Sequence, residues 1–268
     1  MLPIASDLRD EVNEFHALLD RLEEGDWARE TKFKNWTPWD IVAHLHFSDD
    51  AALHSVEGEE AFAAHRKALM DGVREGSSML DLQREAFSHL SAPELLAKWK
   101  DTALALAGTL GECDPKARLP WYGPDMGASM FTTARYMETW AHAQAVYDMK
   151  GMAREPSDRI RNIVAIGYRT FGWTFVNRKL DPPGPPPFVR LTAPSGEIWE
   201  YGDPVEAGPG EKIEGSALDF CLTVTQVRNV KDTGLDVQGE NANAWMEIAQ
   251  CFAGPPVDPP APGARGSD

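Results

Sequence analysis

Cysteine is scarce in this chain of 268 residues, which contains Cys113, Cys221 and Cys251 and no others. Three cysteines so far apart cannot build a disulfide framework, and their spacing matches no zinc-binding cysteine pattern. An apolar run long enough to cross a bilayer is also missing, as is a basic start followed by an apolar stretch near Met1. These absences predict a cytoplasmic protein that does not span a membrane.

Basic residues are outnumbered by acidic ones, with 26 Lys and Arg against 42 Asp and Glu and a net charge of −16. This charge repels nucleic acid and anionic membrane surfaces, so we expect neither as a partner. The hydrophobic share of 43% is ordinary for a soluble globular protein. A chain of this length can bury a sizeable core and divide into two domains.

Residues 1–178 have the pattern of a helical bundle. Apolar residues recur at helical spacing in several segments, and Ser91 with Glu94 forms a capping box that predicts a helix start. The expected helices cover residues 6–24, 37–57, parts of 59–89, 91–110, 135–148 and 157–178.

The composition changes abruptly after this region. Residues 179–187 are rich in proline and predict a stiff linker. Residues 188–253 predict a small α+β domain, because alternating segments flank the turn signal Pro-Ser-Gly at 194–196. Proline and glycine dominate residues 254–268, for which we expect disorder. The elements expected in the small domain are strands at 188–193, 197–201 and 235–238 and helices at 216–226 and 241–252.

Glu138 and His142 lie four residues apart in a predicted helix that Gly151 terminates. Residues at this spacing stand one above the other on one helix face. A carboxylate and an imidazole placed in this way can bind one divalent metal if a third ligand arrives from elsewhere. They can equally form a solvated pair, and their spacing leaves both interpretations open.

A second helix is predicted to begin after Thr37, where a threonine cap, a proline and an aspartate follow in the order that favours a helix N-terminus. His44 lies two turns into this helix, on an apolar stripe that faces a core. A histidine in this position usually has a polar partner in the core. If the two helices pack together, His44 can join Glu138 and His142 in a three-ligand set with an open position, which is typical of a catalytic metal site.

His46, Asp50 and His54 stand at four-residue steps on another face of the same helix. They offer metal ligands too, but acidic neighbours surround them and a solvated face is the preferred interpretation. About 200° of helix separates His44 from His46, so the two cannot face the same interior. Only the stripe of His44 looks buried, and we therefore expect His44 to be the ligand.

These two segments resemble a known family. Trp-Thr-x-x-Asp-x-x-x-His-Leu from Trp36 and Arg-x-x-Glu-x-x-x-His from Arg135 are similar to segments of the DinB-like, mycothiol-dependent maleylpyruvate isomerase family. Residues 188–194, 199–202 and 215–226 resemble the small C-terminal domain of many members, so the resemblance covers roughly residues 5–253. It implies a mainly α fold, with a DinB-like four-helix bundle and a small C-terminal α+β domain. It also implies that His44, Glu138 and His142 are zinc ligands.

The family implies a low-molecular-weight thiol, similar to mycothiol, as cosubstrate. A thiol bound to the metal loses its proton, and the thiolate adds to an electrophilic small molecule, giving thiol transfer or cis–trans isomerisation. The alternatives are a metal-dependent hydrolase and a non-catalytic protein that binds a small ligand. The expected partners are thus a small-molecule substrate and a thiol. The oligomeric state, including a homodimer, stays open.

Three further residues are candidates for the site. Trp121 and Tyr122, in a loop rich in proline and glycine, either cover a pocket for the thiol or pack as a corner of the bundle. Arg135 lies three residues before Glu138 and either holds its carboxylate or forms a surface ion pair.

Two departures from the family pattern concern the substrate. Related sequences commonly have an acidic residue three positions after the second histidine, where this chain has Ala145, with Asp148 one helical step further on. Related enzymes hold the substrate carboxylate with an arginine of the C-terminal domain, and Arg228 is displaced by one position from that place. Arg228 is our candidate catalytic residue, and these departures predict a substrate other than maleylpyruvate.

Overall fold

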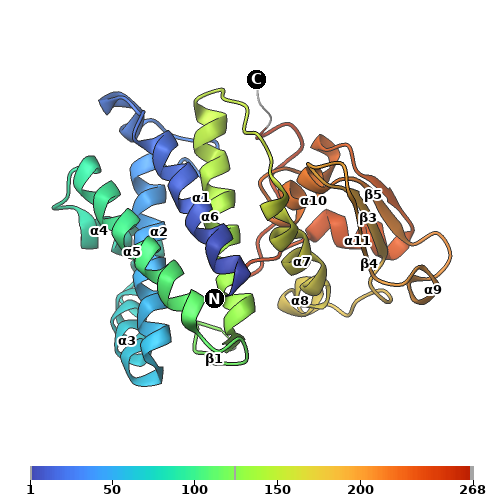
Figure 1. The fold of residues 1–268 in the computed structure, drawn as a ribbon, viewed down its shortest axis with the longest axis horizontal. Helices are drawn as coiled ribbons and strands as arrows, with labels where there is room; N and C mark the ends of the chain where they lie inside the picture. The colour runs from blue at the N-terminus through green and yellow to red at the C-terminus, as the bar shows by residue number, and fades with distance from the viewer. Residues whose placement is uncertain (1, 124, 266–268) are drawn as a thin grey trace. The chain divides into compact units, whose positions relative to one another are not determined.

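The computed structural model describes residues 2–123 and 125–265. Pro124, in the loop that carries Trp121 and Tyr122, and residues 266–268 of the expected tail lie outside the described residues. The chain forms two compact units, Met1–Val146 and Tyr147–Asp268. Helices dominate and the larger sheet lies in the second unit, so the predicted fold class is confirmed (Figure 1).

Four long helices build the first unit. The contacts between them include those of α5 with both α1 and α2. Helix α2 is buried around most of its circumference. The expectation that only the stripe of His44 is buried is wrong, because Val42 and Asp49, on the side of His46, are also inaccessible to solvent. The four helices are α1 (Pro3–Leu19), α2 (Pro38–Glu57), α5 (Ala92–Glu112) and α6 (Ala128–Met149).

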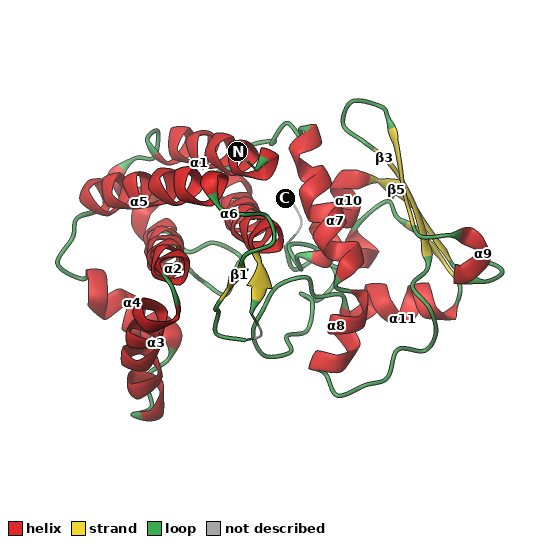
Figure 2. Cartoon of the chain, turned by 60° about the horizontal axis from the view of Figure 1, so that its bottom comes forward, coloured by secondary structure: helices red, strands yellow, loops and turns green. Residues whose placement is uncertain are grey.

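Shorter elements complete this unit. Helices α3 (Glu59–Arg74) and α4 (Met79–Phe87) both pack against α2, as Figure 2 shows. The other elements are η1 (Glu24–Ala28) and the antiparallel pair of β1 (Arg118–Leu119) and β2 (Met126–Gly127). The capping box predicted at Ser91 and Glu94 is present at the start of α5.

The start of α2 explains how His44 is positioned. The Thr37 hydroxyl accepts a hydrogen bond from the Asp40 backbone N–H, and the Asp40 carboxylate accepts one from the Thr37 backbone N–H. This capping box satisfies backbone donors that a helix N-terminus otherwise leaves without partners. Arg84 of α4 donates two hydrogen bonds to the same carboxylate, at 2.7 and 2.8 Å. Capping and docking on α4 therefore define where α2 begins and which side His44 faces.

The second unit contains a four-stranded sheet in the order β4-β3-β5-β6, in which β3 and β5 are parallel and the other pairs antiparallel. Val189, Leu191 and Ile213 are buried in the sheet, and α10 and α11 pack against its strands. Its helices are η2 (Asp158–Ile160), α7 (Arg161–Arg169), α8 (Phe171–Asn177), α9 (Pro204–Ala207), α10 (Ala217–Val224), η3 (Val230–Asp232) and α11 (Glu240–Ile248). Its strands are β3 (Phe188–Thr192), β4 (Ile198–Tyr201), β5 (Lys212–Ser216) and β6 (Asp236–Gln238).

Three features of this unit differ from the sequence-based expectations. The units divide after Val146, so α7 and α8 belong with the sheet, whereas the expected bundle extends to residue 178. Strand β5 was not expected. The described part of the expected disordered tail makes hydrogen bonds, including one from Gln226 to the Val257 carbonyl and one from the Gly263 N–H to Asp232. A proline-rich segment loses little conformational freedom when it is ordered, so a few hydrogen bonds can hold it in place.

Among the described residues, the structure contains no helix with the length and apolar character needed to cross a membrane.

Candidate metal centre

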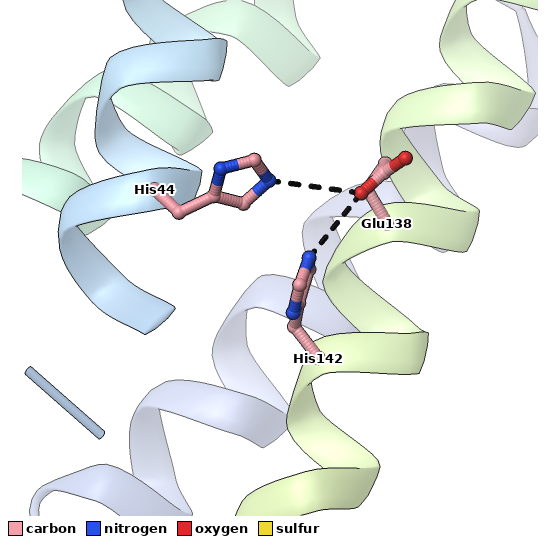
Figure 3. A group of neighbouring side chains, drawn as sticks. All are labelled: His44, Glu138 and His142. Atoms are coloured by element: carbon pink, nitrogen blue, oxygen red, sulfur yellow. Dashed lines mark ion pairs between the residues drawn. The ribbon is translucent and has the colours of Figure 1, made fainter. Parts of the chain in front are cut away.

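The structure brings the three predicted ligands together in the first unit. Nε2 of His142 lies 3.4 Å from Oε2 of Glu138, one turn away on α6. Nε2 of His44, on α2, lies 3.8 Å from the same oxygen. In Figure 3 both imidazole rings point toward the carboxylate, from two helices. One ligand atom from each residue lies within 4.8 Å of the other two.

These separations suit a single metal ion. Bonds of about 2.0–2.2 Å in a tetrahedral arrangement place neighbouring ligand atoms roughly 3.3–3.5 Å apart. The contact of His142 with Glu138 already has this length, and that of His44 exceeds it by a few tenths of an ångström. Two imidazoles and one carboxylate are also donors that zinc accepts, and they leave a fourth position for a further ligand. The residues present therefore fit the metal that the family resemblance implies.

The ionisation of the site favours metal binding. Burial by itself would raise the pKa of Glu138, but hydrogen bonds from His142 and His44 outweigh it and hold the pKa well below its usual range. Burial lowers the pKa of His142 to about 4, against the opposing effect of Glu138. At neutral pH the site thus offers an ionised carboxylate and a neutral His142, the forms that coordinate a metal.

Aromatic rings enclose the two histidines. The Trp36 ring stacks on His142 with centroids 5.7 Å apart and an angle of 2° between the planes, and it also contacts His44 at 5.2 Å. Phe33 meets His142 edge-on at 5.0 Å. Thr31 holds this segment in shape by donating a hydrogen bond to the Trp36 carbonyl at 2.7 Å. Packing of this kind restricts ring rotation and excludes water from one side of the site. Trp36 is part of the motif found in the sequence, whereas no sequence pattern pointed to Phe33.

Gln83 is a residue of the site that the sequence analysis missed. Its side chain on α4 is buried, and its amide lies 3.2 Å from Nδ1 of His44, the ring nitrogen that does not face Glu138. When Nε2 of a histidine binds a metal, Nδ1 carries the proton and needs an acceptor. Oε1 of Gln83 has no hydrogen-bond partner among the described residues. Turning the amide by 180° brings Oε1 to Nδ1, where it can accept a hydrogen bond from a protonated Nδ1.

Arg135 does not have either of the positions expected from the sequence. Its side chain is 4% exposed, which excludes a surface ion pair, and its guanidinium pairs with Asp49 of α2 at 2.9 Å. Trp99 of α5 donates a hydrogen bond to the other oxygen of the same carboxylate at 3.1 Å. Arg135 therefore connects the two helices that carry the predicted ligands. The spacing of three residues from Glu138 gave no sign of a buried acceptor on another helix.

Trp121 and Tyr122 lie in an aromatic cluster of the first unit. Trp121 stacks on Phe62 of α3 with centroids 5.7 Å apart and meets Phe131 of α6 edge-on at 5.0 Å. Tyr122 contacts both Phe62 and Trp121. These contacts match the packed corner that was one of two expectations for the loop. A role of either residue in holding a thiol stays a prediction.

Arg228 belongs to the second unit, where it pairs with Asp148 at 2.7 Å. Asp148 is the acidic residue one helical step beyond Ala145 on α6, and it thus engages the arginine that we expected to bind substrate. Both side chains are largely buried. Catalysis by Arg228 stays a prediction.

The comparisons with known proteins agree with the resemblance read from the sequence. The sequence model described as the mycothiol maleylpyruvate isomerase N-terminal domain matches residues 8–147. Two proteins of Mycobacterium tuberculosis, from strains CDC 1551 and H37Rv, are each 36% identical over 254 residues, covering 95% of this chain and 96% of their own. Both are described only as uncharacterized.

Two solved structures share the fold. A mycothiol-dependent maleylpyruvate isomerase superposes with a TM-score of 0.54 and 14% identity, covering 88% of this chain and 90% of its own. A histidine-to-alanine variant of a mycothiol-dependent maleylpyruvate isomerase superposes with a TM-score of 0.52 and 13% identity, covering 82% of this chain and 86% of its own. At such low identity these likenesses concern the fold alone. Because the sequence model spans more than half of the chain, this protein belongs to the family defined by the mycothiol maleylpyruvate isomerase N-terminal domain.

Proposed function

We propose that this protein is a metal-dependent enzyme that uses a low-molecular-weight thiol to modify an electrophilic small molecule. The observation that carries the proposal is the convergence of His44, Glu138 and His142, with separations that suit one metal ion. Family membership adds to it, because solved relatives are described as mycothiol-dependent isomerases. When bound, a divalent metal such as zinc lowers the pKa of a coordinated thiol and keeps it as thiolate.

The chain's own residues have separate roles in this proposal. His44, Glu138 and His142 hold the metal, and the Gln83 amide, turned so that Oε1 faces His44, accepts a hydrogen bond from Nδ1–H so that Nε2 stays available. Trp36 and Phe33 hold the ring of His142 and keep water from that side of it. Trp121 and Tyr122 are proposed to contact the thiol.

Arg228 is proposed to bind a negatively charged group of the substrate. Its guanidinium already pairs with Asp148, so a substrate anion would share or displace that carboxylate. The extra carboxylate disfavours a doubly charged substrate in this position, because like charges repel at short range. This is a physical reason to expect a substrate other than maleylpyruvate.

The reaction follows from the nucleophile. The thiol proton leaves to solvent, and the sulfur forms a bond to an electrophilic carbon. In a transfer to a double bond, the adduct takes up a proton and keeps the C–S bond; in a transfer to an aryl halide, the C–S bond replaces the carbon–halogen bond and halide ion leaves. In an isomerisation, the former double bond rotates as a single bond, the C–S bond breaks, and the thiolate is released. No cysteine of the protein takes part in either course.

Thiol-dependent turnover of the electrophile provides the test. Zinc-loaded protein is incubated with an activated aryl halide or a cis-ene-dione acid and with mycothiol, glutathione or cysteine. We expect turnover that requires the thiol and falls at least about a hundredfold in His44→Ala and in Glu138→Gln, whereas Cys113→Ser, a control outside the site, keeps the wild-type rate. Unchanged turnover in both ligand variants would contradict the proposal.

Metal-dependent hydrolysis is the second candidate, because two histidines and a glutamate are also the ligand set of zinc hydrolases. Hydrolysis of activated esters in the absence of thiol would favour this function if the hydrolysis is lost in His44→Ala. Saturable binding of the substrates without turnover under either condition would instead indicate a binding protein.

The pH dependence of the thiol-dependent rate adds a further check. A thiol bound to the metal should react well below its usual pKa of about 8.5, whereas uncatalysed reaction follows the free thiolate.

A further inference from the structure

A second group of potential metal ligands lies in the first unit, formed by Asp50 and His54 of α2 and His65 of α3. One ligand atom from each residue lies within 4.8 Å of the other two. Nε2 of His54 is 3.7 Å from Oδ2 of Asp50, one helical turn away. The rings of His54 and His65 face each other with centroids 5.5 Å apart. Two helices thus contribute to this group, as they do at the first.

This group is separate from the centre at His44. Asp50 follows His44 by six residues, which corresponds to about 9 Å along an α-helix and about 240° around it. The two groups therefore occupy different faces and different levels of α2. No residue belongs to both.

His54 has the surroundings of a metal-binding histidine. Its Nδ1 lies 3.3 Å from Oε2 of Glu57, while its Nε2 faces Asp50. A carboxylate that accepts the proton of one ring nitrogen fixes the tautomer and leaves the other nitrogen ready to bind a metal. Glu57 thus positions His54 in the way that Gln83 positions His44.

His65 supplies an independent sign that a partner is missing. Its Nε2 is buried and has no hydrogen-bond partner among the described residues. Phe47 packs against the ring at 5.1 Å. A buried imidazole nitrogen without a partner is unfavourable, and coordination to a metal satisfies it.

We propose that Asp50, His54 and His65 form a second site for a divalent transition metal, which ties α3 to α2. Two imidazoles and one carboxylate favour zinc, cobalt or nickel over magnesium and calcium, which prefer oxygen ligands throughout. Helix α3 buries only Phe62 and Leu69 among its described side chains, so a metal bound to His65 would add a link to a limited apolar contact. The site goes beyond the proposed catalytic function and does not depend on it.

The structure changes which residues share this helix face, while the side chains of Asp50 and His54 stay partly exposed to solvent as expected. The sequence grouped Asp50 and His54 with His46 and favoured a solvated surface. His46 instead packs against Phe87 of α4 at 4.9 Å, and His65, from a helix that begins after Gly58, takes its place in the group. A spacing rule within one helix could not reveal a ligand from the next.

Metal stoichiometry tests the proposal. Metal-free full-length protein is dialysed against buffered zinc, and bound zinc is counted per chain. We expect two equivalents in wild type and in His89→Ala, an exposed histidine outside both groups, and one in His65→Ala. His44→Ala should also retain one equivalent, so a failure of the proposed catalytic centre would be distinguishable from a failure of this site. An equal count in wild type and His65→Ala would overturn the proposal and indicate adventitious binding to the acidic surface.

Hydrogen exchange of α3 gives a second readout. Zinc should slow amide exchange in α3 at least about tenfold in wild type and in His44→Ala, and should have no effect there in His65→Ala. Glu57→Gln, which keeps all three ligands, should weaken zinc binding at this site by about tenfold. Magnesium at the same concentration should neither bind stoichiometrically nor protect α3. If zinc leaves the amide exchange rate of α3 unchanged in wild type and in every variant, the proposed link between the helices is refuted.

Discussion

Arg135 and Asp49 form a buried salt bridge between the two helices that carry the predicted metal ligands. Asp49 follows His44 by five residues on α2, and Arg135 precedes Glu138 by three on α6, so the pair lies about one helical turn from the site. Trp99 donates a further hydrogen bond to the same carboxylate. Small shifts of one helix along the other would break these contacts. The salt bridge therefore holds the ligands of the two helices at the same level.

Removing one charge of this pair should destabilise the bundle strongly. Asp49→Asn leaves the buried guanidinium of Arg135 without its counter-charge, and we expect the free energy of unfolding of metal-free protein to fall by about 3–5 kcal/mol. Urea denaturation measures this change. Lys67→Ala, which breaks the exposed pair of Lys67 with Asp71, is the matched control and should cost at most about 1 kcal/mol. Equal losses in the two variants would show that burial of the pair has no consequence.

Gln83 should control metal affinity through the proton on His44. Gln83→Met has a similar volume and no acceptor, so we expect zinc to bind about 10–100 times more weakly. Gln83→Glu restores an acceptor at the same place and should bind zinc at least as well as wild type. Competition with a chromophoric chelator measures both affinities. If both variants lose affinity to the same extent, Gln83 supports the site only by packing.

Features that depend on neighbouring residues in the chain were predicted well from local patterns in the sequence. The capping box at Thr37, the spacing of Glu138 and His142, and the hairpin strands at 188–192 and 198–201 depend on neighbours in the chain, and the structure contains all of them. Gln83 and Phe33 escaped notice because their roles arise from the docking of other segments onto α2 and α6. A glutamine in a short amphipathic helix has no distinguishing pattern until its buried position is known.

The same limit explains the less accurate predictions in the second unit. Strand β5 reads Lys-Ile-Glu-Gly-Ser, and Ile213 is its one buried residue, so its alternation is too short to detect. It is a strand because β3 and β6 pair with it on both sides. The boundary at Val146 falls inside the continuous helix α6, where composition does not change.

The cap of α2 should make stability depend on pH. Burial would raise the pKa of Asp40, but hydrogen bonds from Arg84 and Thr37 prevail and lower it. A carboxylate with a lowered pKa stabilises the folded state above its unfolded pKa of about 3.9, and this contribution is lost as the pH falls through the folded value.

Arg84→Ala removes one source of that shift. At pH 7 we expect the variant to be less stable than wild type by about 1–2 kcal/mol, toward the low end for hydrogen bonds to a charged group because the Arg84 side chain is half-exposed. The difference should shrink as the pH falls from about 4 through the lowered pKa of Asp40, because wild type then loses the contribution of the ionised carboxylate. Thermal unfolding between pH 3 and pH 7 provides the comparison. A difference that stays constant over this range would mean that Arg84 acts through its packing and not through its charge.

His44 and His46 should respond in opposite ways to replacement. Nε2 of His44 lies in the metal centre, whereas Nδ1 of His46 is buried without a hydrogen-bond partner among the described residues, beside Phe87. His44→Ala should remove one equivalent of tightly held zinc together with any activity. His46→Leu should keep both and be as stable as wild type or slightly more so, because an apolar side chain in place of an unsatisfied nitrogen removes a desolvation cost. The zinc that each variant retains after dialysis against a chelator measures this difference. Circular dichroism confirms that both variants are folded. Loss of the tightly held zinc in His46→Leu and its retention in His44→Ala would show that the other face of α2 carries the ligand.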